Sequence, residues 1–209
     1  MKRRDFLKST AALAGTSMVS APVIWSPAKA QSRSETLLIV SESGPNNIDI
    51  HGVGTNVPGY EVSWNCYDRL ISHEMKTVNG HPYYDRDKFK MELAEDMNVG
   101  QMSATFKLKK NAVFQDSTPV TAKDVKWSLD RAVSVGGFPT FQMGAGSLTK
   151  KEQFVVVDDG TFRVDFQRKD RLTIPDLAVI VPAIYNSELV KKHATEKDPW
   201  GMEIGRAHV

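Results

Sequence analysis

Cysteine is nearly absent from this chain of 209 residues, which contains only Cys66. A single thiol cannot form an internal disulfide, and without a Cys-x-x-Cys pair the chain lacks the ligand pattern of structural zinc and iron–sulfur centres. Apolar residues recur at helical spacing across residues 59–71, so we predict a helix there with Cys66 inside it. Because unpaired cysteine usually behaves as a small hydrophobic residue, we expect a buried side chain rather than a reactive thiol.

Motifs of enzyme active sites are also missing. His73 and Glu74 begin as a zincin helix does, but Thr77 stands where the second histidine is required. The other histidines have no ligand spacing, and no serine lies in a nucleophile elbow. The glycines at residues 136–147 lack the Gly-Lys ending of a phosphate-binding loop, and we expect a flexible loop there. The sequence therefore predicts a protein that is not an enzyme and that has no cofactor or metal.

The chain has no large excess of either charge, with 27 basic and 25 acidic residues and a net charge of +2. The first 30 residues contain five basic residues and one acidic residue, so the remainder has 22 basic and 24 acidic residues, a net of −2. The weakly basic balance therefore comes from the N-terminus alone. It gives no support to nucleic-acid binding.

A long, strongly apolar run is missing from the N-terminus, although this segment is otherwise organised like an export signal. Arg3 and Arg4 precede a Phe-Leu pair, which resembles a twin-arginine signal read by the twin-arginine export machinery. The uncharged residues 9–28 are rich in alanine, serine, threonine and glycine. A retained membrane anchor is the alternative, but a bilayer span needs about 20 predominantly apolar residues.

The end of this N-terminal segment predicts that the signal peptide is cleaved off and that the mature protein is released from the membrane. A small-x-small sequence ends at Ala30, which predicts cleavage between Ala30 and Gln31. Thr16 stands where a lipoprotein would need cysteine, so we expect a non-lipidated, periplasmic protein. At the other end, residues 203–209 resemble the translation of a sequencing adapter. We therefore expect a signal peptide at 1–30, a binding domain at 31–202 and a non-native tail at 203–209.

Between these ends, the chain reads as α/β. A compact apolar strand is predicted at 36–40, and a half-buried strand at 105–109 with Phe106 and Leu108 facing inward. Asp159 and Gly160 favour positive φ and predict a hairpin joining strands at 153–157 and 161–167. The inward side chains of its second strand are expected to be Phe162, Val164 and Phe166. We also predict a short helix at 187–193, capped by Asn186 or Ser187.

The most informative stretch is residues 93–131. Its strand is followed by a turn of Asp, Ser, Thr and Pro at 116–119, and then by Thr121 and Asp124, which fit a capping box at the start of a helix. Apolar residues recur behind the cap at Val125 and Leu129.

This order of residues resembles the signature of family 5 extracellular solute-binding proteins, the peptide and nickel receptors of ABC importers. The matching positions are Leu93, Ala94, Glu95, Thr105, Phe106, Lys107, Leu108, Lys109, Phe114, Asp116, Thr118, Pro119, Thr121, Ala122, Asp124, Val125, Ser128, Leu129 and Arg131. Residues 47–50 and 67–70 are similar to two further family segments. Asn111 and Ser117 stand where the family usually has glycine. Asparagine tolerates left-handed φ, whereas serine suits it less, which leaves the form of the second turn open.

The resemblance implies a periplasmic binding protein type II-like fold, of which this chain is the N-terminal lobe only. It implies a receptor that binds a peptide or another small solute between two lobes and delivers it to ABC permease subunits. Two alternatives stay open, an exported redox enzyme subunit and the same fold binding nickel or haem. We expect the ligand cleft to include the loop at Gly44, Pro45 and Asn46 together with Trp64 and Tyr67, because pockets favour backbone amides, asparagine and aromatic surfaces. The competing interpretation is that Trp64 and Tyr67 are core residues.

Overall fold

The computed structural model describes residues 40–202. The chain divides into two compact units, 1–40 and 41–209, and the description below concerns the second. The predicted signal peptide, its cleavage site, the adapter-like tail and nearly all of the strand at 36–40 lie outside the described residues. Within residues 40–202, no helix is both long enough and apolar enough to span a bilayer.

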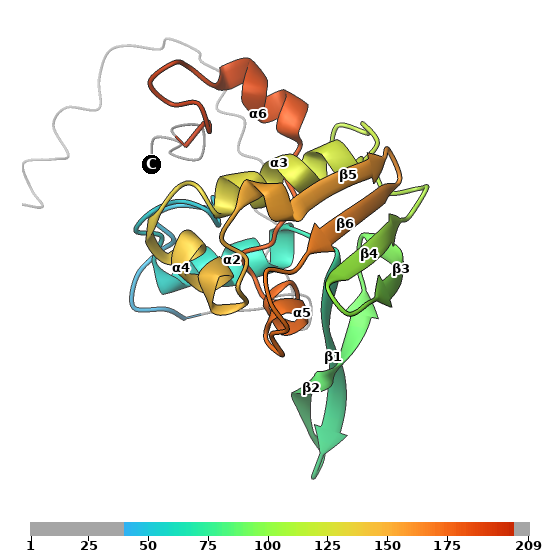
Figure 1. The fold of residues 1–209 in the computed structure, drawn as a ribbon. Helices are drawn as coiled ribbons and strands as arrows, with labels where there is room; N and C mark the ends of the chain where they lie inside the picture. Colours follow the sequence, from blue (N-terminus) through green and yellow to red (C-terminus); the bar gives the residue numbers. More distant parts are fainter. Residues whose placement is uncertain (1–39, 203–209) are drawn as a thin grey trace, which may run out of the picture. The chain divides into compact units, whose positions relative to one another are not determined.

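The described part is a mixed α/β domain with two antiparallel sheets (Figure 1). Its strands are β1 (Ile71–Val78), β2 (His81–Met91), β3 (Ala94–Val99), β4 (Ser103–Leu108), β5 (Phe154–Asp158) and β6 (Thr161–Asp165). Its helices are α2 (Val57–Cys66), α3 (Ala122–Ala132), α4 (Gly137–Ala145), the 3₁₀ turn η2 (Lys151–Gln153), α5 (Thr173–Asp176) and α6 (Ser187–His193).

The main core lies between the four-stranded sheet and α3. The strand order is β3-β4-β6-β5, and Phe106 of β4 pairs directly with Phe162 of β6. The alternation predicted for β4 is confirmed, since Ala104, Phe106 and Leu108 are buried while Lys107 is exposed. Phe162 and Val164 of β6 are fully buried, as predicted, and Phe166 packs against the same core. Burial of large apolar side chains on one sheet face is the main stabilising contribution here.

The β5–β6 hairpin forms where the sequence predicts it, but its turn is of another kind. The two strands pair antiparallel, with Asp158 opposite Thr161 and an irregular register between Val156 and Asp158. Gly160 is not among the residues with positive φ, so the expectation of left-handed residues in this turn is wrong. Instead, the Asp158 carboxylate accepts a hydrogen bond of 2.8 Å from the Gly160 backbone N–H. This side-chain bond holds the turn in place of the backbone geometry that we expected.

The first predicted helix is shorter than expected and begins earlier. Helix α2 covers Val57–Cys66, not 59–71, because the Asn56 side chain caps it by accepting from Gly59 N. The chain then becomes extended, and Ile71 starts a strand. Cys66 is therefore the last helical residue, and it is exposed rather than buried. The predicted helical face that would continue from Cys66 to residues 67–71 does not form, because the helix has already ended.

Strands β1 and β2 form an arm that extends beyond the four-stranded sheet (Figure 1). Its tip is an Asn79-Gly80 turn with φ of 52° and 80°, the two positive values that a type I′ hairpin requires. The outer part of both strands is exposed on both faces. Because no alternation of hydrophobicity marks such strands, the sequence reading missed them, although Asn-Gly is a hairpin signal in itself.

Residues 137–145 are a helix, not the flexible loop predicted from their glycine content. The N-cap Gly136 has φ of 79°, and Pro139 lies in the first turn, where a missing N–H costs no helical hydrogen bond. The Thr140 hydroxyl accepts from Gly136 N and donates to Ala132 O, at 2.9 Å each, and so joins α4 to the end of α3. Glycine and proline here therefore begin a helix rather than prevent one.

The two positions where the family usually has glycine behave in opposite ways. Ser117 takes φ of 68°, the left-handed region, whereas Asn111 is not among the residues with positive φ. The turn at Ser117 therefore keeps the glycine-like conformation with a residue that suits it poorly. Left-handed backbone costs an L-residue roughly 1–2 kcal/mol.

We expect Ser117→Gly to raise the free energy of unfolding by about 0.5–1 kcal/mol, because glycine relieves this strain but gains entropy in the unfolded chain. Urea denaturation followed by circular dichroism measures the change. The matched control, Asn111→Gly, should instead lower stability by a few tenths to about 1 kcal/mol. Equal effects of the two substitutions would show that backbone strain at Ser117 has no energetic role.

Candidate functional site

The signature residues of α3 hold the scaffold together. The Asp124 carboxylate accepts from the backbone N–H and the hydroxyl of Thr121, at 3.0 and 2.7 Å, which confirms the predicted capping box. The same carboxylate accepts from the N–H and hydroxyl of Ser187, at 3.1 and 2.8 Å. Ser128 continues the connection, since its hydroxyl accepts from Tyr185 N at 2.9 Å. These bonds attach α3 to the segment that leads into α6.

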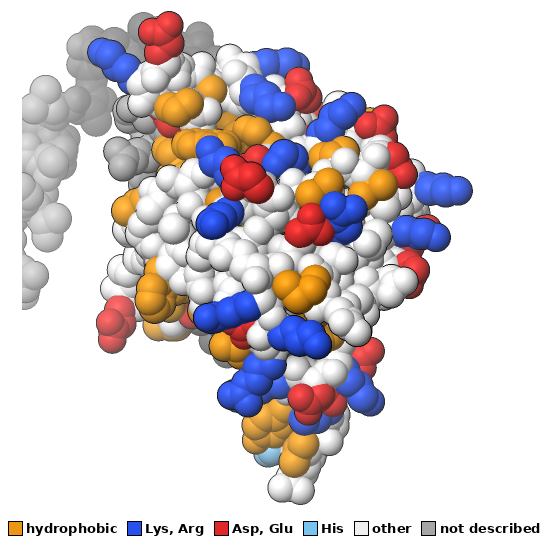
Figure 2. Space-filling view, in the orientation of Figure 1, with side chains coloured by type: hydrophobic (Ala, Val, Ile, Leu, Met, Phe, Trp, Pro, Cys, Tyr) orange, Lys and Arg blue, Asp and Glu red, His pale blue; other side chains and the backbone are white. Residues whose placement is uncertain are grey.

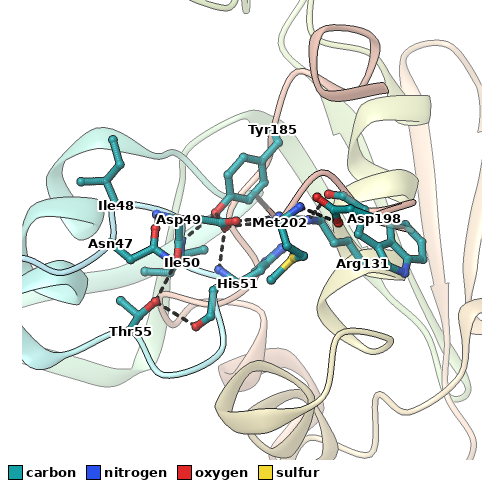
Figure 3. A network of polar contacts seen from close by, with 12 residues as sticks. Asn47, Ile48, Asp49, Ile50, His51, Thr55, Arg131, Tyr185, Asp198 and Met202 are labelled. Carbon is teal, nitrogen blue, oxygen red and sulfur yellow. Dashed lines mark hydrogen bonds and ion pairs between the residues drawn. The ribbon is translucent and has the colours of Figure 1, made fainter. Parts of the chain in front are cut away.

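A buried ion pair joins two family-like segments that are distant in the sequence. The Arg131 guanidinium donates to both carboxylate oxygens of Asp49, at 2.8 and 2.6 Å (Figure 3). Their side chains are only 2% and 7% exposed. The Tyr185 hydroxyl donates to Asp49 at 3.0 Å and accepts from Ile50 N at 3.0 Å. Arg131 also donates to the Trp200 carbonyl at 2.9 Å, so the network reaches the end of the described chain.

The charges in this network are well matched. Burial alone would raise the pKa of Asp49, but the hydrogen bond and charge of Arg131 more than offset it and hold this pKa below its ordinary value. His51 lies beside the pair with its Nε2 2.7 Å from the Val181 carbonyl. Burial, reinforced by the charge of Arg131, lowers the pKa of His51 to about 4. His51 is therefore neutral at pH 7, and the Asp49–Arg131 pair is satisfied by contacts within the protein.

An open groove of about 520 Å³ has the most apolar lining of the hollows in the described part of the chain. It lies between α2, the β1–β2 arm and the start of α4, and Ile180 also contributes to it. The lining residues are Val57, Tyr60, Glu61, Trp64, Asn65, Tyr84, Phe138 and Ile180. The aromatic rings form pairs along the groove, with centroids 5.3 Å apart for Tyr60 and Phe138 and 6.2 Å apart for Trp64 and Tyr84.

The Trp64 ring is held in place by the positive charge of Arg69, which the Glu92 carboxylate neutralises. The Arg69 guanidinium lies 4.7 Å from the centroid of the Trp64 ring. Arg69 in turn makes a two-bond contact with the Glu92 carboxylate, at 3.0 and 2.8 Å. A guanidinium over an indole face is a favourable cation–π arrangement, and it fixes the ring without adding a lining charge.

The predicted loop at Gly44, Pro45 and Asn46 is exposed and is bonded to the start of α2. The Asn46 side chain accepts from Asn56 N at 2.9 Å and donates to Gly54 O at 3.0 Å, while Asn56 donates to Gly44 O at 2.9 Å. Asn56 is the N-cap of α2, and the next residue, Val57, lines the groove. The loop is thus connected to one end of the groove through the helix cap, although none of its three residues lines the groove.

Tyr67 faces a different hollow from Trp64. Its ring packs on Tyr185 with centroids 4.8 Å apart, and it contributes to a cavity of about 230 Å³ that Cys66 also lines. The two predicted aromatic residues are therefore not brought together. Sequence reasoning missed three groove aromatics, Tyr60, Tyr84 and Phe138, which come from three separate elements. The Asn79-Gly80 turn was the available signal for the strand that carries Tyr84.

Residues 40–202 contain no group of three histidine, cysteine, aspartate or glutamate side chains placed to hold a metal ion. His73 and Glu74 lie on strand β1, so the incipient zincin motif is not on a helix. On the visible face, basic and acidic side chains are interspersed, with no extended patch of one sign (Figure 2).

The described domain matches part of the fold of periplasmic binding proteins of type II. It matches the oligopeptide-binding protein OppA of Haemophilus influenzae in complex with the peptide RPPGFSPFR, with a TM-score of 0.60 and 17% identity over 75% of this chain and 31% of that one. It also matches AgaA from A. tumefaciens R10 in complex with agropinic acid, with a TM-score of 0.58 and 26% identity over 74% of this chain and 29% of that one.

Sequence comparison gives the family. The model for bacterial extracellular solute-binding proteins, family 5 Middle, matches residues 88–204, more than half of the chain, and the chain belongs to this family. A curated relative, the probable D,D-dipeptide-binding periplasmic protein DdpA of Escherichia coli K12, is 27% identical over 162 residues, which cover 78% of this chain and 30% of that protein. The chain thus spans about a third of the length of the proteins it matches.

Proposed function

We propose that this chain is the N-terminal part of the substrate-binding component of an ABC importer, and that the receptor binds oligopeptides or dipeptides and delivers them to membrane permease subunits. The observation that carries the proposal is the family match over residues 88–204. Relatives with peptides in their names or complexes support this ligand class, and DdpA, OppA and a dipeptide-binding protein from Pseudoalteromonas sp. SM9913 with Met-Leu are examples.

The proposed mechanism is binding followed by delivery. The lobe described here would supply one wall of a cleft, and a second lobe outside this chain would supply the other. A ligand that contacts both lobes biases the equilibrium toward the closed form, which a permease can distinguish from the open one. Such a protein performs no chemistry on its solute, in agreement with the lack of a catalytic motif in the sequence.

Several further parts of the proposal rest on the sequence. Arg3 and Arg4 direct export through the twin-arginine machinery, and cleavage between Ala30 and Gln31 releases a non-lipidated periplasmic protein. Residues 203–209 are a non-native tail, since they resemble the translation of a sequencing adapter. AgaA, described with agropinic acid, favours a second candidate, a non-peptide small solute bound by the same fold.

We predict that Trp64→Ala in the complete receptor weakens peptide binding by about tenfold or more, because the ring supplies apolar area to the groove. The melting temperature should fall by only a few degrees, since Trp64 is half-buried. Isothermal titration calorimetry with a set of di- and tripeptides measures the affinity.

The matched control is Trp127→Ala. This ring packs on Trp200 with centroids 5.7 Å apart and against a small apolar cluster of Ile50, Ala183 and Tyr185, and it does not line the groove. It should lower the melting temperature more than Trp64→Ala does and leave peptide affinity unchanged. Unaltered affinity in Trp64→Ala would remove this residue from the site, and failure of the wild-type receptor to bind any peptide would contradict the proposed function.

A further inference from the structure

The tip of the β1–β2 arm carries a chemically reactive pair of residues, Asn79 and Gly80. This is the only Asn-Gly dipeptide in the sequence, and every other asparagine precedes a residue that has a side chain. We propose that Asn79 is a site of spontaneous deamidation, in which its side-chain amide is lost and the turn acquires an aspartate or an isoaspartate. The modification concerns the arm and does not depend on which ligand the receptor binds.

The reaction uses only these two residues and water. The Gly80 backbone nitrogen gives up its proton to solvent and attacks Asn79 Cγ, which closes a succinimide ring. The Cγ–Nδ2 bond breaks, and the leaving nitrogen takes a proton from water and departs as ammonia. Water then opens the ring at either carbonyl, to give aspartate or an isoaspartate whose main chain passes through Cβ. In both products a carboxylate, ionised at neutral pH, replaces a neutral amide.

The two reacting groups are unrestrained in the structure. Asn79 and Gly80 are both exposed, and within residues 40–202 neither the Asn79 side-chain amide nor the Gly80 N–H has a hydrogen-bond partner. A methyl group added at Gly80 would meet no atom within 4 Å, so water reaches the site freely. Glycine also has no Cβ of its own to hinder attack by its nitrogen.

Ring closure requires rotation about the Asn79 Cα–C bond, and the arm permits this movement. Strands β1 and β2 pair only with each other among the described strands, and their outer residues are exposed on both faces. A two-stranded hairpin of this kind is marginally stable in water. Figure 1 shows the tip extending away from the four-stranded sheet. Because few buried contacts hold the tip, it opens at a low cost in free energy.

The turn of the β5–β6 hairpin contains a comparable pair, but its groups are engaged. Asp159-Gly160 is the only Asp-Gly dipeptide, and aspartate can form the same ring by losing water. The Gly160 N–H, however, donates to the Asp158 carboxylate at 2.8 Å, and the Asp159 carboxylate lies 3.0 Å from Lys123 Nζ. This hairpin is also part of the four-stranded sheet. The structure therefore favours reaction at the arm tip over reaction here.

Isoaspartate at position 79 would lengthen the main chain of a two-residue turn. Val78 lies opposite His81 across this turn, and a longer connection does not preserve that register. The outer pairs of the arm have no buried side chains to retain them, whereas the inner end begins at Ile71, which is fully buried. We therefore expect faster hydrogen exchange of the backbone amides of residues 75–84 in aged protein, with no change in the core.

The test is peptide mapping by mass spectrometry of the complete receptor after incubation at pH 6 and at pH 8, with isoaspartate detected by an isoaspartyl methyltransferase. We expect Asn79 to be converted at least about tenfold faster than Asn98 or Asn111. Its conversion should be faster at pH 8 than at pH 6, because the attacking nitrogen must lose its proton.

The two comparison asparagines are also exposed, but each has an unfavourable neighbour. Asn98 lies in strand β3 and precedes Val99, whose branched side chain crowds its backbone nitrogen. Asn111 precedes Ala112, and the Ala112 N–H already donates to the Lys109 carbonyl at 3.1 Å. Exposure is therefore matched, and only the access of the attacking nitrogen differs.

Asn79→Gly is the matched variant, because Gly-Gly also suits a type I′ turn. It should fold as the wild type does and give no isoaspartate signal from the arm. Equal conversion of Asn79, Asn98 and Asn111 would overturn the proposal, as would an isoaspartate signal that persists undiminished in Asn79→Gly. Isoaspartate formation at Asp159 as fast as at Asn79 would show that the free Gly80 N–H and the open arm confer no reactivity, and would also overturn it.

Discussion

Replacing Arg131 with alanine is expected to lower the free energy of unfolding by about 3–5 kcal/mol. The substitution removes both hydrogen bonds to Asp49 and leaves a carboxylate that is only 7% exposed without its partner charge. Burial would then raise the pKa of Asp49, because Arg131 is what holds it down in the intact protein. The Tyr185 hydroxyl would remain as one hydrogen-bond donor to Asp49, too little to replace a guanidinium.

A surface ion pair on the same helix provides the control. Lys123 lies 3.0 Å from Asp159, but the two side chains are 69% and 75% exposed. Lys123→Ala should therefore cost less than about 1 kcal/mol. The double variant Asp49→Asn with Arg131→Met should recover most of the loss, because it removes both buried charges together. Urea unfolding of all three variants tests this, and equal losses for Arg131→Ala and Lys123→Ala would contradict the assigned role of the buried pair.

Replacing Asp176 with asparagine is expected to raise the free energy of unfolding at pH 8 by about 3 kcal/mol. Burial raises the pKa of Asp176 from its ordinary value of 3.8 to about 6, although hydrogen bonds from Gln142 and from Gly146 N oppose this. Above pH 6, the folded protein therefore contains an ionised carboxylate that burial disfavours. Asparagine keeps an acceptor for Gly146 N, and a 180° rotation of the Gln142 amide would let the Gln142 oxygen, which has no partner in the described structure, accept from the new amide N–H.

The sign of the pH dependence follows from proton binding. Between pH 3.8 and 6 the folded state holds a proton on Asp176 that the unfolded state has lost, so this residue makes stability fall as pH rises. His51 acts in the opposite direction: its pKa of about 4 lies below the ordinary 6.5, so its contribution is complete above pH 6.5 and is lost as pH falls toward 4. The two slopes largely cancel in the wild-type protein.

Asp176→Asn removes the contribution of Asp176 to the pH dependence of stability and leaves that of His51. Its melting temperature should exceed that of the wild type at pH 8, and the difference should shrink as pH falls from 6 to 4. The stability of the variant should then rise with pH between about 4 and 6.5, as His51 alone dictates. Calorimetric melts from pH 4 to pH 8 measure both curves. A stabilisation of the same size at every pH would show that the gain comes from packing rather than from charge.

The elements that sequence predicted well are those in which local chemistry and burial agree. The alternation around Phe106 gave β4, and the capping box at Thr121 and Asp124 gave the start of α3. Asn186 caps α6 by accepting from Leu189 N at 3.0 Å, also as predicted. In each case a few adjacent residues determine the outcome, so no knowledge of distant contacts is needed.

The failures concern segments whose structure depends on distant partners. The arm has polar and exposed faces on both sides, so hydrophobic periodicity could not reveal it. Helix α4 forms despite its glycines because Thr140 bonds it to the end of α3. The candidate site shows the same limit: Trp64 was identified, but its neighbours Tyr84 and Phe138 come from elements that sequence order does not place beside α2. The signature at residues 93–131 identified the family, but its residues Asp124, Ser128 and Arg131 hold the fold together and do not line the groove.

The Asp49 network also determines when the chain can finish folding. Ile50 N bonds to the hydroxyl of Tyr185, 135 positions later in the sequence, and Arg131 bonds to the carbonyl of Trp200. At a synthesis rate of about 5–20 residues per second, the ribosome needs roughly 7–27 seconds to make the residues between Ile50 and Tyr185. During that interval residues 49–51 lack one or more of their buried partners Arg131, Val181 and Tyr185, so the network closes only after residue 185 has been made.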